Sequence, residues 1–454
     1  MSRRLRFFTP NARPNAPSAD GGLAALGVGI ALVCIVLVQA GDLRAKVAHF
    51  LWLYGTMFAL YLVAIAWISR SGDTPRLRLP LIVLIGVLCR AILLAGEPTL
   101  SDDIYRYQWD GRVQLAGTNP YRYPPNHPDL AFLRTPADAN INHPDLETIY
   151  PPGAQWVFRA AAALSPDVSG QKAAFVLFDI ATIGVIAALL RQRSHHPAWC
   201  LIYAWNPLVL IEYAHSGHVD SIAVFWLVLG LYSLGSGRPG WGMASLALAA
   251  LAKYFAAILL PYAIVRSSLR RWIPLFVAVI VLGYAWFVDA PRAWFASLGV
   301  YAARWEFNSA SFTALNLLLG HGVWTRAVLL AALLAWSLYH ARRQQDPVRY
   351  AYLVIGFALT FSPTLHPWYV CWIVPFLCVY RSPAWIAFTG LVALSYWVWV
   401  DARAGGAWTI RPQLLALEYA PFYALLAWEG CTRVFPRRRG RASATEGVTV
   451  TSSS

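Results

Sequence analysis

Residues 22–40 read GLAALGVGIALVCIVLVQA, an apolar run without a charged side chain. This run is about as long as an α-helix must be to cross the hydrocarbon core of a bilayer. Similar apolar runs occur at 51–68, 173–190, 273–288 and 384–400. Backbone polar groups in hydrocarbon must be satisfied within the protein, and the alternation typical of barrel strands is absent from these runs. The sequence therefore predicts an all-α, polytopic integral membrane protein.

Composition supports this class. The chain is 58% hydrophobic and only 13% charged, whereas soluble domains carry about 25% charged residues. The formal net charge is +15, but the arginines lie in short segments between apolar runs, which favours membrane topology over a nucleic-acid-binding domain. The six cysteines lie mostly within or beside apolar runs, with neither metal-binding spacing nor a paired framework, so we expect no structural disulfide.

Arginine-rich turns predict the topology. The positive-inside rule places them in the cytoplasm: Arg70, Arg76 and Arg78; Arg191 and Arg193; Arg238; Arg266, Arg270 and Arg271; Arg342 and Arg343; Arg381; and Arg437, Arg438 and Arg439. Residues 1–20 are then a cytoplasmic segment, 21–431 a single transmembrane domain of about 12–14 membrane segments, and 432–454 a basic, then disordered cytoplasmic tail. The first apolar run resembles a signal peptide, but its length favours a retained helix.

Two regions depart from simple crossings. The segment from about 96 to 171 is the longest stretch without an apolar run that could span the membrane. This length predicts an external loop with a structure of its own. Within 241–265, Lys253 and Pro261 interrupt an apolar stretch. Only a hairpin of two short helices, with Lys253 near its outer tip, keeps both arginine-flanked ends of that stretch in the cytoplasm. A lysine within a membrane usually faces a polar cavity or a partner. The alternatives are that Lys253 snorkels to the interface or that the predicted helix ends are misplaced.

The external loop opens with SDDIYRYQWD at 101–110. Ser101 or Asp102 is placed to cap a helix that Gly117 ends, and we expect this helix to lie along the membrane surface with its aromatic side chains in the interface. Adjacent carboxylates at Asp102 and Asp103 suit a general base, which sugar hydroxyls need, and also suit divalent metal binding through oxygen ligands. The alternative is a helix cap with a solvated neighbour.

Further motifs follow along the chain. NPYRYPP at 119–125 and IYPPGAQ at 149–155 predict rigid aromatic turns. GHVD follows at 217–220, AKY at 252–254, and SPTLHPWY at 362–369. The predicted topology places the aspartate, GHVD, lysine and HPWY sites on one side of the membrane. His215, His218 and Asp220 could also ligate a metal, but the spacing assigns no third ligand, so no metal site is predicted.

Together these motifs resemble bacterial GT-C glycosyltransferases, especially the polyprenyl-phosphomannose-dependent mannosyltransferases. The resemblance implies a GT-C-like helical bundle in the bacterial inner membrane that transfers a hexose, with mannose favoured, from a polyprenyl-phosphate sugar to a lipid or glycan acceptor at the external face, with inversion. It makes Asp102 or Asp103 the catalytic base. The expected substrate-binding residues are Tyr105, Arg106, Asn119, Tyr121, Tyr150, His218, Asp220, Lys253, Arg304, His366, Trp368 and Tyr369.

Among these residues, Lys253 and Arg106 are the first candidates to stabilise the leaving phosphate, with Arg304 behind them. No cofactor is implied with certainty, and a divalent metal stays open. The aspartate loop follows the third apparent crossing instead of the first, which two additional N-terminal helices would explain. Alternative functions are a multi-pass transporter or lipid-linked sugar flippase, which fits a charged, broken helix, and a non-catalytic assembly partner.

Overall fold

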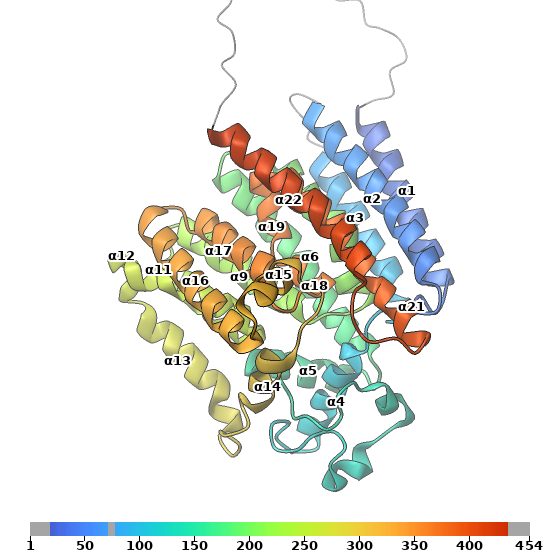
Figure 1. The fold of residues 1–454 in the computed structure, drawn as a ribbon, viewed down its shortest axis with the longest axis vertical. Coiled ribbons are helices and arrows are strands. Elements are labelled where there is room, and N and C mark those ends of the chain that lie inside the picture. The colour runs from blue at the N-terminus through green and yellow to red at the C-terminus, as the bar shows by residue number, and fades with distance from the viewer. Residues whose placement is uncertain (1–18, 71–77, 435–454) are drawn as a thin grey trace, which may run out of the picture.

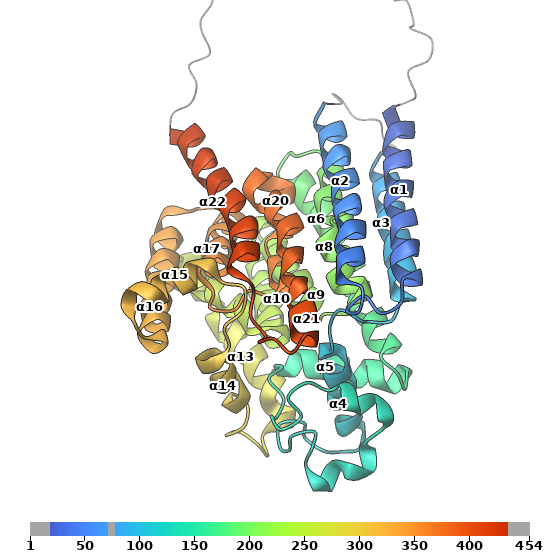
Figure 2. The same cartoon turned by 45° about the vertical axis from the view of Figure 1, so that its right-hand side comes forward.

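The computed structural model describes residues 19–70 and 78–434, and its regular elements are helices (Figures 1 and 2). The chain is an all-α polytopic membrane protein, as predicted. Most of the N-terminal segment 1–20, residues 71–77 and the tail beyond Val434 lie outside the described residues. All six cysteines are free, and five of them are buried.

Three long helices form an N-terminal layer: α1 (Ala19–Gln39), α2 (Val47–Arg70) and α3 (Arg78–Leu94). The first apolar run is a packed part of this layer, because α1 contacts both α2 and α3 and buries Leu23, Ile30 and Leu37 completely. Figure 2 shows the three helices side by side at one edge of the molecule. The aspartate loop follows α3, the third of these helices.

The loop of about 96–171, which the sequence predicts to be external, is folded, as predicted. It contains α4 (Asp103–Leu115), η1 (Pro128–Leu133), η2 (Pro136–Asn140) and α5 (Pro152–Leu164). The expectation that α4 exposes its aromatic side chains to the membrane interface is wrong: Tyr107 and Trp109 are at most 1% exposed. The reason is the close packing of α4 on α5, where a Cβ on Gly111 would collide with the backbone of Phe158.

The remaining chain forms the body of the bundle. Its first part comprises α6 (Ser169–Gln192), η3 (Pro197–Cys200), α7 (Leu201–Ala204), α8 (Pro207–Val209), the π-helix η4 (Leu210–His215), α9 (Asp220–Gly235), α10 (Pro239–Ala252), η5 (Tyr254–Leu259), α11 (Leu260–Val265), α12 (Ser267–Arg270), α13 (Ile273–Tyr284) and η6 (Ala285–Phe287). Its second part comprises α14 (Ala296–Arg304), α15 (Ala310–Leu319), α16 (Gly322–Arg343), α17 (Pro347–Phe361), α18 (Pro367–Val370), α19 (Val374–Tyr380), α20 (Pro383–Leu391), η7 (Val392–Trp397), α21 (Val398–Arg403) and α22 (Pro412–Val434).

Many of these helices are short because prolines divide the apolar sequence. Proline lacks the backbone N–H that a helix interior needs, but it fits the first turn, where several helices of the bundle carry one. In the described residues, six helices are long and apolar enough to cross a membrane, and six shorter apolar helices accompany them. The predicted 12–14 membrane segments therefore include helices too short to span a bilayer singly.

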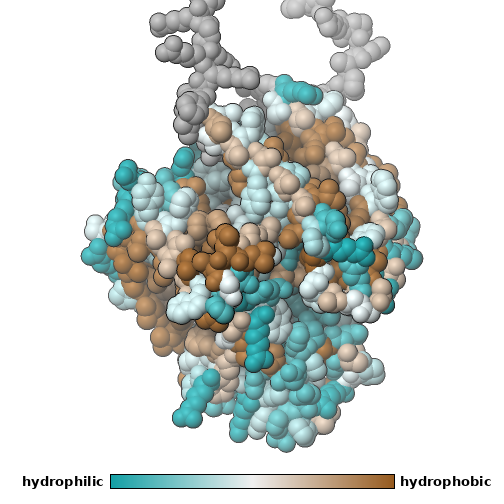
Figure 3. Space-filling view, viewed as in Figure 1, coloured by the Kyte–Doolittle hydropathy of each residue, from teal (hydrophilic) through white to brown (hydrophobic). Residues whose placement is uncertain are grey.

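The surface shows which part faces lipid. Hydrophobic residues gather over the helical body, and hydrophilic residues gather over the end that carries α4 and the external loop (Figure 3). Trp52 on α2, Trp286 on η6 and Leu317 on α15 are each more than two-thirds exposed. Exposure of such large apolar side chains to water would be unfavourable, but their exposure to the hydrocarbon of a bilayer is not.

The predicted cytoplasmic turns meet at one end of the bundle. Arg193 pairs with Asp346, which also accepts a hydrogen bond from the Tyr380 hydroxyl at 3.1 Å. Arg266 donates to Oε1 of Gln345 at 2.8 Å, and the Arg381 guanidinium lies 4.5 Å from the Trp199 ring centroid. These contacts join four arginine-bearing turns that are far apart in sequence.

Lys253 lies at the opposite end of its hairpin. Helix α10 ends at Ala252, Lys253 has an extended backbone, and η5 and α11 then return toward Arg266. Lys253 pairs with Asp220 at the start of α9, whereas Arg266 contacts Gln345 in the arginine-rich end. The predicted hairpin with the lysine at its tip is confirmed.

Candidate active site

Two adjacent carboxylates lie where the chain enters α4. Ser101 Oγ accepts a hydrogen bond from the backbone N–H of Asp103 at 3.3 Å, whereas Asp102 is the N-cap residue but makes no side-chain cap. The predicted boundaries hold, since Gly117 adopts a left-handed φ of 81° just after the helix. The helix start therefore leaves both carboxylates free for other contacts, and the cap-only alternative fails for Asp102.

A single amide holds the two carboxylates together. Nδ2 of Asn142, which follows η2, donates at 2.9 Å to Oδ1 of Asp102 and at 2.9 Å to Oδ1 of Asp103. The side chains of Asp102 and Asp103 are 28% and 21% exposed. Both acids are thus oriented by the protein while a part of each remains open to a substrate.

Their environment makes Asp103 the better proton acceptor. Burial raises the pKa of Asp103 to about 6, and the negative charge of Asp102 acts in the same direction, while the Asn142 hydrogen bond and the charge of Lys253 oppose the rise. A carboxylate with a pKa near the working pH combines a useful ionised fraction with a strong tendency to take a proton. Asp103 therefore has a pKa suited to accepting a proton near neutral pH.

The GHVD motif places an imidazole beside Asp103. Gly217 has a φ of 72°, and a Cβ there would lie 2.5 Å from Cδ1 of Ile104, so only glycine fits between the motif and α4. This close approach brings Nδ1 of the fully buried His218 to 3.8 Å from Oδ2 of Asp103. Asp220, two residues later, begins α9.

Lys253 and Asp220 form an ion pair at the hairpin tip. Nζ of Lys253 lies 2.8 Å from Oδ2 of Asp220, whose other oxygen accepts from Nε1 of Trp372 at 2.6 Å. The Lys253 ammonium also lies 5.0 Å from the centroid of the Tyr369 ring. Asp220 is fully buried, whereas 18% of the Lys253 side chain is exposed.

The HPWY turn completes this side of the cluster. Trp368 is stacked between the imidazoles of His218 and His366, with centroid separations of 3.9 and 4.4 Å. The hydroxyl of Tyr369 lies 2.7 Å from that of Tyr301. Four segments that are distant in sequence thus meet at one site, as the topology predicted.

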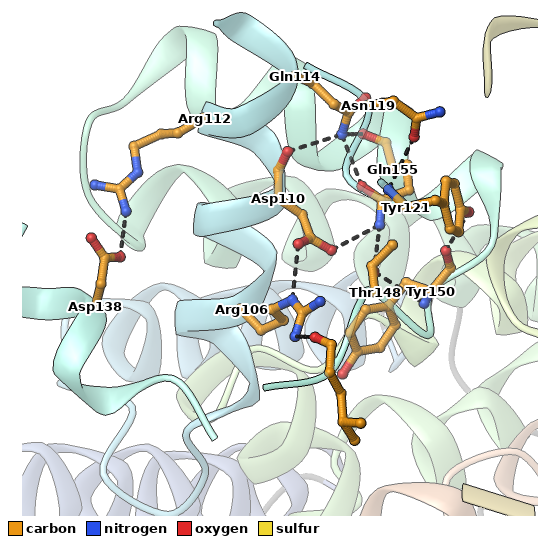
Figure 4. Close-up of polar contacts among 11 residues, drawn as sticks. Arg106, Asp110, Arg112, Gln114, Asn119, Tyr121, Asp138, Thr148, Tyr150 and Gln155 are labelled. Carbon is orange, nitrogen blue, oxygen red and sulfur yellow. Dashed lines mark hydrogen bonds and ion pairs between the residues drawn. The ribbon is translucent and has the colours of Figure 1, made fainter. Parts of the chain in front are cut away.

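Several predicted site residues instead hold the external loop together (Figure 4). Arg106 Nε pairs with Asp110 at 2.9 Å, and Gln155 donates to both Asp110 and Thr148 at 2.8 Å. Arg106 also donates to the Leu146 carbonyl at 2.9 Å. This network of buried polar groups fastens α4 to α5 and to the turn at 146–150, so the positive charge of Arg106 is already neutralised.

The aromatic turns have a similar role. The Tyr121 hydroxyl donates to the Tyr150 carbonyl at 2.6 Å (Figure 4). Nδ2 of Asn119 donates to Oδ1 of Asp289 at 2.5 Å. Tyr105 is half-buried against the Trp109 cluster. Arg304 is exposed at the end of α14 and has no contact with the cluster among the described residues. These predicted binding residues frame the loop or lie apart from the cluster around Asp103.

The structure also adds residues that the motifs did not identify. Asn142 bridges the acids from an irregular loop, where no periodic pattern marks it. Arg44 Nη1 lies 4.0 Å from Oδ2 of Asp102, and its guanidinium lies over the Trp399 ring. In the described residues, no group of three or more His, Cys, Asp or Glu side chains is arranged to hold a metal ion.

Comparison with known proteins identifies the larger part of the chain. A family model described as alpha-(1->6)-mannopyranosyltransferase, N-terminal domain, matches residues 22–268, more than half of the sequence. The matched segment contains both acids of α4, the GHVD motif and Lys253. No curated protein and no solved structure matches the chain.

Proposed function

The chain belongs to the alpha-(1->6)-mannopyranosyltransferase family, and from this premise we propose that it transfers mannose from a polyprenyl-phosphate donor to a lipid-linked or glycan acceptor at the external face of the bacterial inner membrane. Family membership supports a mannosyltransferase activity in a membrane protein. The donor, the acceptor, the face and the inverting course are our proposal.

The proposed external location of the two acids favours a sugar donor that is carried by a lipid. The acids of α4 lie at the end of the bundle opposite the arginine-rich turns, and positive-inside topology places those turns in the cytoplasm. Nucleotide sugars are cytoplasmic, so a donor at the external end must have been carried across the bilayer. A polyprenyl chain meets this need, because it stays in the hydrocarbon while its phosphate reaches the membrane surface.

One observation carries the assignment of the chemistry: Asp103 is a partly exposed carboxylate with a pKa near 6, oriented by Asn142 and close to the cationic Lys253. In the proposed step, a primary hydroxyl of the acceptor, as the (1->6) linkage requires, attacks the anomeric carbon of mannose while Asp103 takes the hydroxyl proton. The bond between that carbon and the phosphate oxygen breaks. Polyprenyl phosphate leaves, and its charge is stabilised by Lys253. With inversion, an alpha product requires a beta-linked donor.

Substitution of each acid tests this function. Asn keeps the size of Asp and removes the base, so Asp103→Asn should lower kcat by about 100-fold or more with polyprenyl-phosphate mannose and a mannoside acceptor. Asp102→Asn is the matched control and should retain most of the activity, because Asp102 has no contact with His218. Size-exclusion chromatography confirms that both variants are folded. If Asp103→Asn retains wild-type transfer, the base assignment is wrong; if purified wild type moves lipid-linked sugar without transfer, the flippase alternative replaces the proposal.

A further inference from the structure

Behind Asp103 lies a buried acid–imidazole pair that the proposed reaction does not use. Glu212 and His218 are both fully buried, and Nε2 of His218 lies 3.3 Å from Oε2 of Glu212. The other oxygen of Glu212 accepts a hydrogen bond from the Tyr396 hydroxyl at 2.7 Å. Tyr396, Glu212, His218 and Asp103 thus form a continuous polar line from the interior of the bundle to the proposed base.

The buried polar groups of Glu212 and His218 destabilise the fold, so packing alone does not explain why they are there. Both ring nitrogens of His218 and Oε2 of Glu212 lack a fully formed hydrogen bond within the described part of the chain. Each such buried group costs about 1–3 kcal/mol. Glu212 also lies in the π-helix η4, and π-helical turns occur frequently at functional sites. An apolar pair of the same shape would avoid the cost, so these groups need another explanation.

The orientation of His218 is fixed from two sides. The imidazole is stacked on Trp368 with an angle of 15° between the ring planes, and Gly217 presses the backbone against Ile104. With Nε2 directed at Glu212, Nδ1 faces Oδ2 of Asp103 at 3.8 Å. Contacts between catalytic groups are often long without substrate and shorten when it binds.

We propose that Glu212 and His218 share one proton, and that this pair directs an Nδ1–H of His218 at Asp103 and so keeps the base ionised. The proposal rests on the proposed function of Asp103. Burial of an isolated carboxylate is very unfavourable, whereas one proton shared between carboxylate and imidazole leaves the pair neutral. The same proton forces the other imidazole hydrogen onto Nδ1. Glu212 and His218 are therefore positioning residues that act through Asp103.

Other charged and titratable groups face this line and enter its electrostatics. Asp103 is influenced by Asp102, Asn142, Lys253 and Asp220; His218 by Lys253 and His366; and Glu212 by Asp220 and Tyr396, with Tyr54 and Cys371 nearby. Burial and Asp102 disfavour the ionised form of Asp103. A hydrogen bond from His218 offsets this effect, and its loss must raise the pKa of Asp103 further.

The acidic limb of the kcat–pH profile measures this effect. A hydrogen bond to a charged group is strong enough that its loss should move the limb upward by about one pH unit. His218→Leu removes the donor and should show this shift, with activity recovering at alkaline pH. His218→Asn keeps an amide N–H near the position of Nδ1 and should return the limb close to that of wild type. A merely structural histidine would lower activity at every pH.

Glu212 variants test the shared proton while the imidazole remains in its stack. Glu212→Gln still donates to Nε2 and should leave the limb near its wild-type position, whereas Glu212→Leu should shift it as His218→Leu does. An unchanged limb in folded His218→Leu, or a Glu212→Gln limb shifted as far as that of Glu212→Leu, overturns the proposal. Failure of the proposed function is a separate result, since Asp103→Asn would then retain activity.

Discussion

Lys253 and Asp220 form a 2.8 Å ion pair at the tip of the α10–η5 hairpin. The carboxylate is fully buried and held by Trp372, while 18% of the lysine side chain is exposed. This asymmetry fixes the lysine at one point and still allows a phosphate oxygen to approach it. Loss of the lysine would therefore have two effects: it would weaken donor binding, and it would leave the buried Asp220 carboxylate without its partner.

Lys253→Met should raise the KM for the polyprenyl-phosphate donor by about tenfold or more, because a charge-assisted hydrogen bond contributes about 1.5–3 kcal/mol. The same change leaves Asp220 unpaired, which should lower the melting temperature. The double variant Lys253→Met/Asp220→Asn is the control: it should recover stability but not donor binding. Wild-type donor KM in the stable double variant would remove Lys253 from the phosphate site.

The sequence predicts the arrangement of segments better than the individual contacts. Apolar runs and arginine positions suffice to predict the hairpin of Lys253 and the placement of the GHVD and HPWY motifs on one side, since both follow from which end of a helix each residue occupies. The stacking of His218 on Trp368 could not be predicted in this way. The position of Arg44 near Asp102 could not be predicted, because no sequence pattern indicates that the turn after α1 packs beside the start of α4. Asn142 lies in an irregular loop, whose path depends on tertiary contacts.

Arg106 illustrates a different limit. Arg106 lies four residues before Asp110 on one helix, a spacing that favours an ion pair, and the structure contains this pair. The prediction that Arg106 binds the phosphate did not take this local partner into account. Burial decides the matter, because α4 is not an interfacial helix: its packing on α5 encloses Arg106 and Asp110. Amphipathic spacing alone cannot distinguish a helix on a membrane from one within a small external domain.

Arg106→Met should therefore act on stability. Removing one partner of a buried ion pair costs about 3–5 kcal/mol, so we expect a clear fall in melting temperature and expression. Arg122→Met is the matched control, because Arg122 is exposed in the same loop, and it should be nearly neutral. The folded fraction of Arg106→Met should keep a wild-type donor KM. A large increase in that KM, without loss of stability, would instead return Arg106 to the phosphate site.

The pH dependence of the wild type follows from the pKa of Asp103 near 6. The base must be ionised, so kcat/KM should be level above about pH 7 and fall about tenfold per pH unit well below pH 6. In the folded state the pKa of Asp103 lies above the ordinary aspartate value of 3.8, so the folded protein binds more protons than the unfolded chain between about pH 4 and 6. Asp103 titration therefore lowers the free energy of unfolding as the pH rises from about 4 to about 6.

Asp103→Asn removes this titration. The variant should accordingly be at least as stable as wild type at pH 7, with a stability difference that shrinks toward pH 4, where Asp103 is protonated in the wild type. Thermal unfolding at several pH values measures this difference. A variant markedly less stable than wild type at pH 7 would identify Asp103 as a structural cap and contradict its assignment as a base held ready for catalysis.

The last prediction concerns the side of the membrane on which the site lies, because the lipid-borne donor depends on it. Five of the six cysteines are buried and Cys431 is exposed, so Cys431→Ser provides a background with little labelling. Cysteine is then introduced at the exposed Asn126, in the external loop, or at the exposed Arg342, at the arginine-rich end. In intact cells, a membrane-impermeant maleimide should label Asn126→Cys, whereas Arg342→Cys should react only after the membrane is opened. The two positions control for each other, since the described structure places them at opposite ends of the bundle. Labelling of Arg342→Cys alone in intact cells would place Asp103 and Lys253 in the cytoplasm. Nucleotide sugars would then reach the site directly, and the case for a polyprenyl-phosphate donor would lose its physical basis.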